Sequence, residues 1–224
     1  MSFISGAAVV CAKDLRIEMR TREVVTTAGF FGVLVALMAA LSYAGAASDV
    51  RVAPGTIWLA VAFASVMAIG RTWQREREDS SFISLLVSPL PRGAIFVGKA
   101  IGVLVFVLAV EVVVVPIVAL VFHVDLALVG PSLALILFLG TIGVAATGTL
   151  FGAMTVRTRA RDLLLATVLF PLLSPTLLCS VSATREVFMG ATIAEVRDWL
   201  VIIVTFDIIF VAGGLGLFGA LVED

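Results

Sequence analysis

Two carboxylic acids, Glu111 and Asp207, stand inside long apolar stretches, where a charged group is costly. If these stretches cross a bilayer, both acids lie near its middle, so each must be protonated, paired or turned toward a wet interior. Such acids could relay protons, contact a transported cargo or couple helices. A plain interhelical hydrogen bond that fixes packing explains them equally well. Both interpretations remain open at this point.

His123 is the only histidine, and it follows an apolar stretch together with Asp125. Imidazole is a common ligand of metals and of haem iron. No second ligand stands at metal-binding spacing, so the pattern favours an interfacial polar residue over a metal or cofactor site. Cys11 and Cys179 are expected on opposite sides of the membrane and are interpreted as small apolar residues.

Motifs for nucleotide binding, covalent haem attachment and hydrolysis are absent from the sequence. It contains no Gly-x-x-x-x-Gly-Lys-Ser/Thr, no Cys-x-x-Cys-His and no Gly-x-Ser-x-Gly. We therefore predict a chain without a catalytic site, which binds no cofactor directly. Any energy from ATP must come through a partner subunit.

The composition indicates the elements that position these residues. The chain is 61% hydrophobic and 14% charged, with a mean hydropathy of +1.19, whereas about a quarter of residues are charged in soluble domains. Backbone groups in lipid must be paired within their own segment, so continuous apolar runs of about 20 residues predict helices. We expect one all-α membrane domain over residues 1–224 with six transmembrane helices. These spans are expected at about 24–45, 54–70, 100–122, 127–156, 163–182 and 199–222.

The distribution of Lys and Arg predicts the orientation. With a cytoplasmic N-terminus, twelve of these residues fall on the cytoplasmic side and only Arg51, Arg185 and Arg197 on the other. Both termini are therefore expected in the cytoplasm.

Two segments outside the spans have the character of surface helices. The pattern of residues 8–23 predicts an amphipathic helix that lies on the membrane surface, either as a solvated entry helix or as an elbow against a partner protein.

The segment of residues 71–92 joins spans two and three, and it is too long for a simple turn. Ser80 and Ser81 can cap a short helix there, which Pro89 and Pro91 would end. A short amphipathic helix held at a membrane surface has the form of a docking element, although a loop helix buried against the spans has the same pattern.

Small residues and prolines mark three of the expected spans. Gly140, Gly143, Gly148 and Gly152 in span four predict close helix approach, within the bundle or across a dimer. Pro116 in span three, with Pro171 and Pro175 in span five, predicts kinks or interruptions.

The order of several short motifs resembles the CcmB family, the membrane permease subunit of the cytochrome c maturation ABC transporter. The resemblance covers nearly the whole chain, and its strength is the order and spacing of the motifs together. The motifs are Lys13-Asp-Leu-Arg-Ile-Glu-Met-Arg-Thr-Arg-Glu23, Ala53-Pro-Gly-Thr-Ile-Trp58, Arg75-Glu-Arg-Glu-Asp79, Leu85-Leu-Val-Ser-Pro-Leu-Pro-Arg92, Gly98-Lys99, Leu139-Gly-Thr-Ile-Gly143, Thr158-Arg-Ala-Arg161, Phe170-Pro-Leu-Leu173 and Phe206-Asp-Ile-Ile-Phe210.

This resemblance implies a six-helix permease of the ABC-2 type in the bacterial inner membrane. It implies an ATPase partner, CcmA, the partners CcmC and CcmD, and indirectly the haem chaperone CcmE, with two permease copies by analogy to the wider class. In this family ATP hydrolysis is thought to release haem-loaded CcmE from CcmC, and haem is handled by the partner subunits. The segment that begins at Arg75 then becomes a coupling helix seated in the ATPase. The residues that we expect to mediate this coupling are Arg75, Glu76, Arg77, Glu78, Asp79, Phe82 and Leu85.

Three other functions remain as alternatives. One is an ATP-independent carrier in which Glu111 and Asp207 relay protons, although the two halves show no inverted repeat. A second is a passive scaffold for haem-handling proteins. The third is an ABC-2 permease that moves an unrelated lipid or small molecule. None of the alternatives involves nucleic acid.

Overall fold

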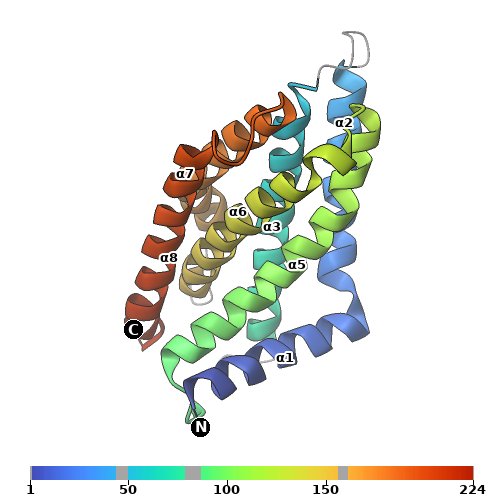
Figure 1. Cartoon of the computed structure of the whole chain (residues 1–224). Coiled ribbons are helices and arrows are strands. Elements are labelled where there is room, and N and C mark those ends of the chain that lie inside the picture. The colour runs from blue at the N-terminus through green and yellow to red at the C-terminus, as the bar shows by residue number, and fades with distance from the viewer. Residues whose placement is uncertain (1, 44–49, 79–86, 156–160, 224) are drawn as a thin grey trace.

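The computed structural model describes residues 2–43, 50–78, 87–155 and 161–223, and within these ranges the regular structure is entirely helical. Figure 1 shows a bundle of long helices with one helix lying across its end. The helices are α1 (Phe3–Thr21), α2 (Glu23–Tyr43), α3 (Ala53–Glu78), α5 (Arg92–Val121), α6 (Leu126–Thr155), α7 (Arg161–Phe188) and α8 (Arg197–Glu223).

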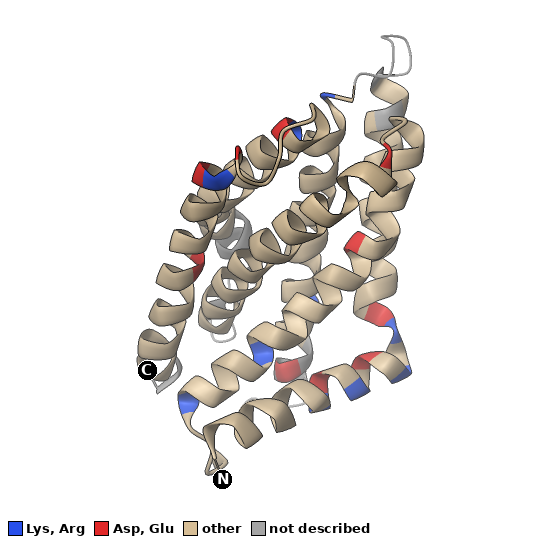
Figure 2. Cartoon of the chain, in the orientation of Figure 1, with Lys and Arg blue, Asp and Glu red and all other residues tan. Residues whose placement is uncertain are grey.

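The six long helices confirm a polytopic, all-α membrane protein. The helices α3, α5, α6, α7 and α8 each contain a stretch long and apolar enough to cross a membrane. The sixth, α2, passes the same test together with α1, from which it is bent by 70°. In Figure 2, Lys, Arg, Asp and Glu gather mainly toward the two ends of the bundle, as expected when a lipid belt surrounds the middle.

The helix α1 begins and ends earlier than the expected range of 8–23. Ser2 caps its first turn by accepting a hydrogen bond from the Ser5 backbone N–H at 3.3 Å. At the other end Arg22 adopts a left-handed backbone with φ of 52°, and its N–H bonds to the Glu18 carbonyl. The Glu18 side chain in turn accepts from the Val25 N–H at 2.9 Å, which satisfies a free donor at the start of α2. This pair of bonds fixes the turn between surface helix and first span.

Two spans extend further than the apolar pattern predicts. The helix α3 continues through the polar residues 71–78, so the first part of the predicted connecting segment is a helical extension of span two. The helix α5 begins at Arg92 directly after Pro91, well before the expected start at residue 100. The expected start at residue 100 follows directly after the charged Lys99, as if that residue lay at the membrane surface. In the structure Lys99 is buried and paired, so it does not mark that surface.

The prolines do not interrupt their helices. Pro116 lies inside α5, and Pro171 and Pro175 lie inside α7, each within one continuous helix. The prediction was of kinks or interruptions: the interruptions are absent at these positions, and the kinks stay a prediction. Neighbouring helices and 3₁₀ or π adjustments can accommodate the lost backbone bond in a membrane bundle.

The glycines of α6 confirm the predicted close approach, and they do so within the bundle. A Cβ atom on Gly140 would lie 2.4 Å from Cη2 of Trp58, and one on Gly152 would lie 2.3 Å from Nε1 of Trp73. Both tryptophans belong to α3, which crosses α6 closely because these positions lack side chains. The Trp58 ring is fixed further by a 2.9 Å hydrogen bond from its Nε1 to Oγ1 of Thr184 on α7.

We expect Gly140→Ala to lower the free energy of unfolding by about 1–3 kcal/mol, because the added methyl group must displace the fixed Trp58 ring. Gly130→Ala is the matched control on the same helix. A Cβ there meets nothing within 4 Å, so only the favourable helix propensity of alanine acts. Denaturation of the purified variants in mixed micelles measures both. Equal stability of the two variants would show that α3 and α6 do not pack as described.

Candidate functional site

A cluster of buried charges ties α1, α3 and α5 together at the end of the bundle that holds both chain termini (Figure 1). Lys99 of α5 is its centre, with only 2% of its side chain exposed. Its Nζ lies 2.9 Å from Oδ2 and 3.1 Å from Oδ1 of Asp14 on α1, and it also bonds to Oε1 of Glu76 on α3. Lys13 of α1 pairs with the same Glu76 oxygen.

The cluster contains two lysines and two carboxylates, so its charges balance. Lys13 lies 3.3 Å from Asp14 and is the most exposed member, at 35% of its side chain. Burial lowers the pKa of Lys13, but Asp14 and Glu76 raise it by more, so the pKa lies above its ordinary value and the ammonium stays charged. The Lys99 ammonium also sits 5.6 Å from the ring centre of Trp73, which adds a cation–π contact.

The approach of α1 to α5 explains how the cluster forms. A Cβ on Gly98 would lie 2.6 Å from the Ala7 carbonyl oxygen and 2.7 Å from Cβ of Val10. Only glycine lets the backbone of α1 lie this close to α5, which brings Asp14 within reach of the neighbouring Lys99. The motif Gly98-Lys99 therefore has a packing reason and an electrostatic one.

The predicted coupling residues fall into three groups. Glu76 is described and is buried, with 3% of its surface exposed, so its carboxylate faces the cluster and not the solvent. Arg75, Arg77 and Glu78 lie in the last turns of α3, but their side chains are outside the described set. Asp79, Phe82 and Leu85 lie outside the described residues altogether. Contact of any of these with an ATPase stays a prediction.

Sequence reasoning placed Glu76 on a docking surface and did not single out Asp14 or Lys99 as partners. The available signal was Lys99, which stands alone among apolar residues just before the expected third span. In a membrane protein such a cation needs a buried counter-charge. The structure shows that Glu76 and Asp14 provide it.

The intramembrane acids lie on different sides of α6. Glu111 of α5 is 3% exposed, and its Oε1 accepts a 2.5 Å hydrogen bond from Oγ1 of Thr141. Asp207 of α8 is 6% exposed and packs against Gly143, where a Cβ would lie 2.3 Å from its Oδ1. Residues two positions apart on a helix point in different directions, so α6 separates the two acids. This arrangement does not favour direct proton transfer between them.

We predict that the folded bundle tolerates Glu111→Gln but not Glu111→Leu. Glutamine retains an oxygen that accepts from Thr141, whereas leucine leaves a buried hydroxyl without its partner. The measurement is the free energy of unfolding of each purified variant in mixed micelles. If both substitutions are silent, Glu111 has no essential role.

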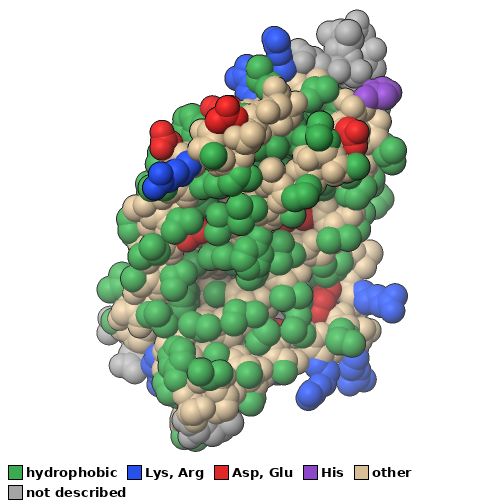
Figure 3. All heavy atoms as spheres, in the orientation of Figure 1, with side chains coloured by type: hydrophobic (Ala, Val, Ile, Leu, Met, Phe, Trp, Pro, Cys, Tyr) green, Lys and Arg blue, Asp and Glu red, His purple; other side chains and the backbone are tan. Residues whose placement is uncertain are grey.

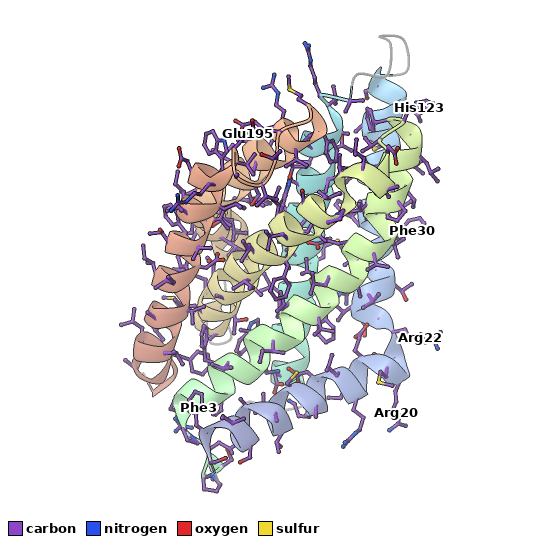
Figure 4. All side chains as sticks on the ribbon, in the orientation of Figure 1. Phe3, Arg20, Arg22, Phe30, His123 and Glu195 are labelled. Carbon is purple, nitrogen blue, oxygen red and sulfur yellow. The ribbon has the colours of Figure 1, made fainter. Side chains whose placement is uncertain are left out.

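His123 and Glu195 lie at the end of the bundle opposite Arg20, Arg22 and Phe3 (Figure 4). His123 is exposed and has a φ of 57°, just after the end of α5. Its neighbour Asp125 accepts from the Ala127 N–H at 2.9 Å and so caps the start of α6. Among the described residues, no three His, Cys, Asp or Glu side chains gather in a way that could hold a metal ion. Cys11 and Cys179 are free thiols in α1 and α7.

Comparison with known proteins decides the family. Residues 6–219 match the family described as CcmB protein. The chain belongs to the CcmB family. Curated relatives are named heme exporter protein B. The relative from Bradyrhizobium diazoefficiens is 26% identical over 188 residues, which is 84% of each chain. The one from Pseudomonas aeruginosa is 25% identical over 194 residues, which is 86% of each chain.

A third relative, from Paracoccus denitrificans, is 32% identical over 145 residues, covering 63% of this chain and 64% of the relative. The match to the CcmB family includes every helix with a member of the charge cluster, because α3 and α5 lie within residues 6–219 and α1 lies mostly within them. The resemblance found in the short motifs is thereby confirmed.

Proposed function

We propose that this chain is the membrane subunit of the ABC transporter of cytochrome c maturation, with a role in haem export or haem release. The observation that carries the proposal is the CcmB family match over residues 6–219, in a polytopic helical protein. The names of the curated relatives, heme exporter protein B, support haem as the molecule concerned. In this proposal the chain is not an enzyme, and it binds neither ATP nor haem directly.

The proposed partners are the ATPase CcmA, the membrane subunits CcmC and CcmD and, indirectly, the haem chaperone CcmE. ATP hydrolysis by CcmA drives the release of haem-loaded CcmE from CcmC, and two copies of this chain face two ATPase subunits. The proposed location is the bacterial inner membrane, with both termini cytoplasmic. The predicted excess of Lys and Arg on the cytoplasmic side, twelve against three, supports this orientation.

The charge cluster supports a route for coupling. Glu76 lies two residues before the end of α3, where the segment 79–86 begins, and it is bonded to Lys99 of α5 and Lys13 of α1. A push on that segment by the ATPase would therefore reach three helices together. Rigid-body movement of packed helices is a common form of switching, because packed cores shift between discrete arrangements.

Complementation tests the proposal. The gene is placed in a bacterial strain that lacks its own CcmB protein, and membranes are stained for covalently bound haem. We expect restored c-type cytochromes only when an ATPase-competent CcmA is present. Restoration with an inactive ATPase would favour a passive scaffold, and failure to restore despite normal membrane insertion would contradict the proposed role.

A further inference from the structure

An apolar pocket opens between α5 and α6 on the outside of the bundle. Its volume is about 540 Å³, within the range of about 300–1,000 Å³ that is typical of small-molecule sites. Val112 and Pro116 of α5 and Gly130, Leu133 and Leu137 of α6 are among its lining residues. Figure 3 shows the surrounding face as a mainly hydrophobic surface between the charged ends of the molecule.

One lining residue is polar. Glu111 bonds to Thr141 through Oε1, but Oε2 has no hydrogen-bond partner among the described residues, although it is fully buried. Buried polar atoms in proteins are nearly always paired, so an unpaired carboxyl oxygen in a pocket of this size points to a ligand. The pocket thus combines a large apolar volume with a single point for a hydrogen bond.

The depth of Glu111 restricts the kind of ligand. It precedes Val121, the last residue of α5, by ten positions, which is about 15 Å at a rise of 1.5 Å per residue. This is half of a hydrocarbon core of about 30 Å, so the pocket opens near the bilayer midplane. A phospholipid keeps its head group at the surface, and its acyl chain alone would leave Oε2 unpaired.

We propose that this pocket binds a neutral, membrane-dissolved alcohol or phenol, with the hydroxyl group bonded to Oε2 of Glu111. A hydroxyl both donates and accepts, so it pairs with this oxygen whether the carboxyl group is protonated or ionised. The apolar body of the molecule fills the volume beside Pro116 and Leu133. The inference stands apart from the proposed role in cytochrome c maturation.

Two other occupants fit less well. The lining residues include no His, Cys, Met or Tyr, which are the side chains that hold haem iron in proteins. A transmembrane helix of another protein is about 10 Å across, so it cannot enter a recess in which Glu111 is only 3% exposed.

Photolabelling of the purified full-length chain in lipid nanodiscs tests the proposal. The probe is a long-chain alcohol that carries a diazirine on its alkyl chain, and the corresponding alkane, which can neither donate nor accept a hydrogen bond, is the matched control. We expect the alcohol to label residues of α5 and α6 around the pocket about fivefold to tenfold more than the alkane, since one hydrogen bond separates the two. Glu111→Leu should abolish this preference, and Glu111→Gln should keep most of it, which also guards against a misfolded leucine variant.

Three results would overturn the proposal. The first is equal labelling by alcohol and alkane in the unchanged chain, which would indicate ordinary partitioning of alkyl chains. The second is a preference that survives Glu111→Leu in a folded variant. The third is loss of labelling when the chain is purified together with its complex partners, which would assign the pocket to a helix interface.

Discussion

Replacing Lys99 with methionine is expected to lower the free energy of unfolding by about 3–5 kcal/mol, because buried carboxylates would lose their shared cation. Asp14 and Glu76 would remain buried in the cluster with only the half-exposed Lys13 to balance them. Unfolding of the purified protein in mixed micelles, followed by tryptophan fluorescence, measures the change. Accumulation in membranes should fall in parallel.

Two control variants test whether the loss of stability comes from the buried pairing of Lys99 and not from the loss of a positive charge alone. Arg20→Met removes a cation from the exposed surface of the same region, and a change within about 0.5 kcal/mol is expected. The double variant Lys99→Met with Glu76→Met removes a whole pair and leaves Asp14 with Lys13 at 3.3 Å. Buried pairs replaced by apolar side chains are often neutral in stability, so most of the loss should be recovered. A single variant as stable as the original chain would show that the cluster does not hold the helices together.

Reversing the charges of Glu78 and Asp79 to lysine is expected to abolish cytochrome c maturation while the protein still inserts. These acids lie at the end of α3 and the start of the predicted docking segment. If they face basic residues of the ATPase, the reversal places like charges together, which costs several kcal/mol in an interface. Covalent haem staining and an immunoblot of the membranes measure function and insertion in the same samples.

The matched control for this reversal lies at the opposite end of the bundle. Glu195→Lys with Asp198→Lys changes the same number of charges at exposed positions, and Glu195 lies on the face away from the proposed ATPase. We expect normal maturation from that variant. Normal maturation after the reversal at Glu78 and Asp79 would remove these residues from the coupling route.

The presence of the spans could be predicted from the sequence because long apolar runs indicate them, although α3 and α5 extend beyond these runs. Lipid requires helices for long apolar runs, and the glycines of α6 indicated close packing before any partner was known. The Trp58 and Trp73 rings that fill the space beside those glycines could not be identified, since they come from a helix distant in the sequence. Local patterns do not show which helices become neighbours.

The charge cluster could not be predicted for a related reason. Lys13, Asp14, Glu76 and Lys99 flank apolar runs, and flanking charges are typical of the membrane surface. Their burial depends on α1 folding back across the end of the bundle, which the left-handed turn at Arg22 and the bare surface at Gly98 make possible. The sequence indicated an amphipathic helix there, but not the side of the bundle on which it lies. Glu76 consequently looked like a docking residue.

The two intramembrane acids show both what the sequence could indicate and what it could not. The sequence placed Glu111 and Asp207 inside apolar runs, and the structure shows that both side chains are buried. The bond from Thr141 to Glu111 and the position of Asp207 against Gly143 depend on how α5 and α8 pack on α6. A relay between the two acids was compatible with the sequence alone, whereas the structure places α6 between them.

The most direct test of the proposed function follows haem in a strain from which this gene has been deleted. Membranes are stained for covalently bound haem, and haem-loaded CcmE is detected by blotting after purification of CcmC. The account predicts loss of c-type cytochromes, with haem-loaded CcmE retained on CcmC. Normal c-type cytochromes in the deletion strain would contradict it and leave a polytopic membrane protein with a different cargo.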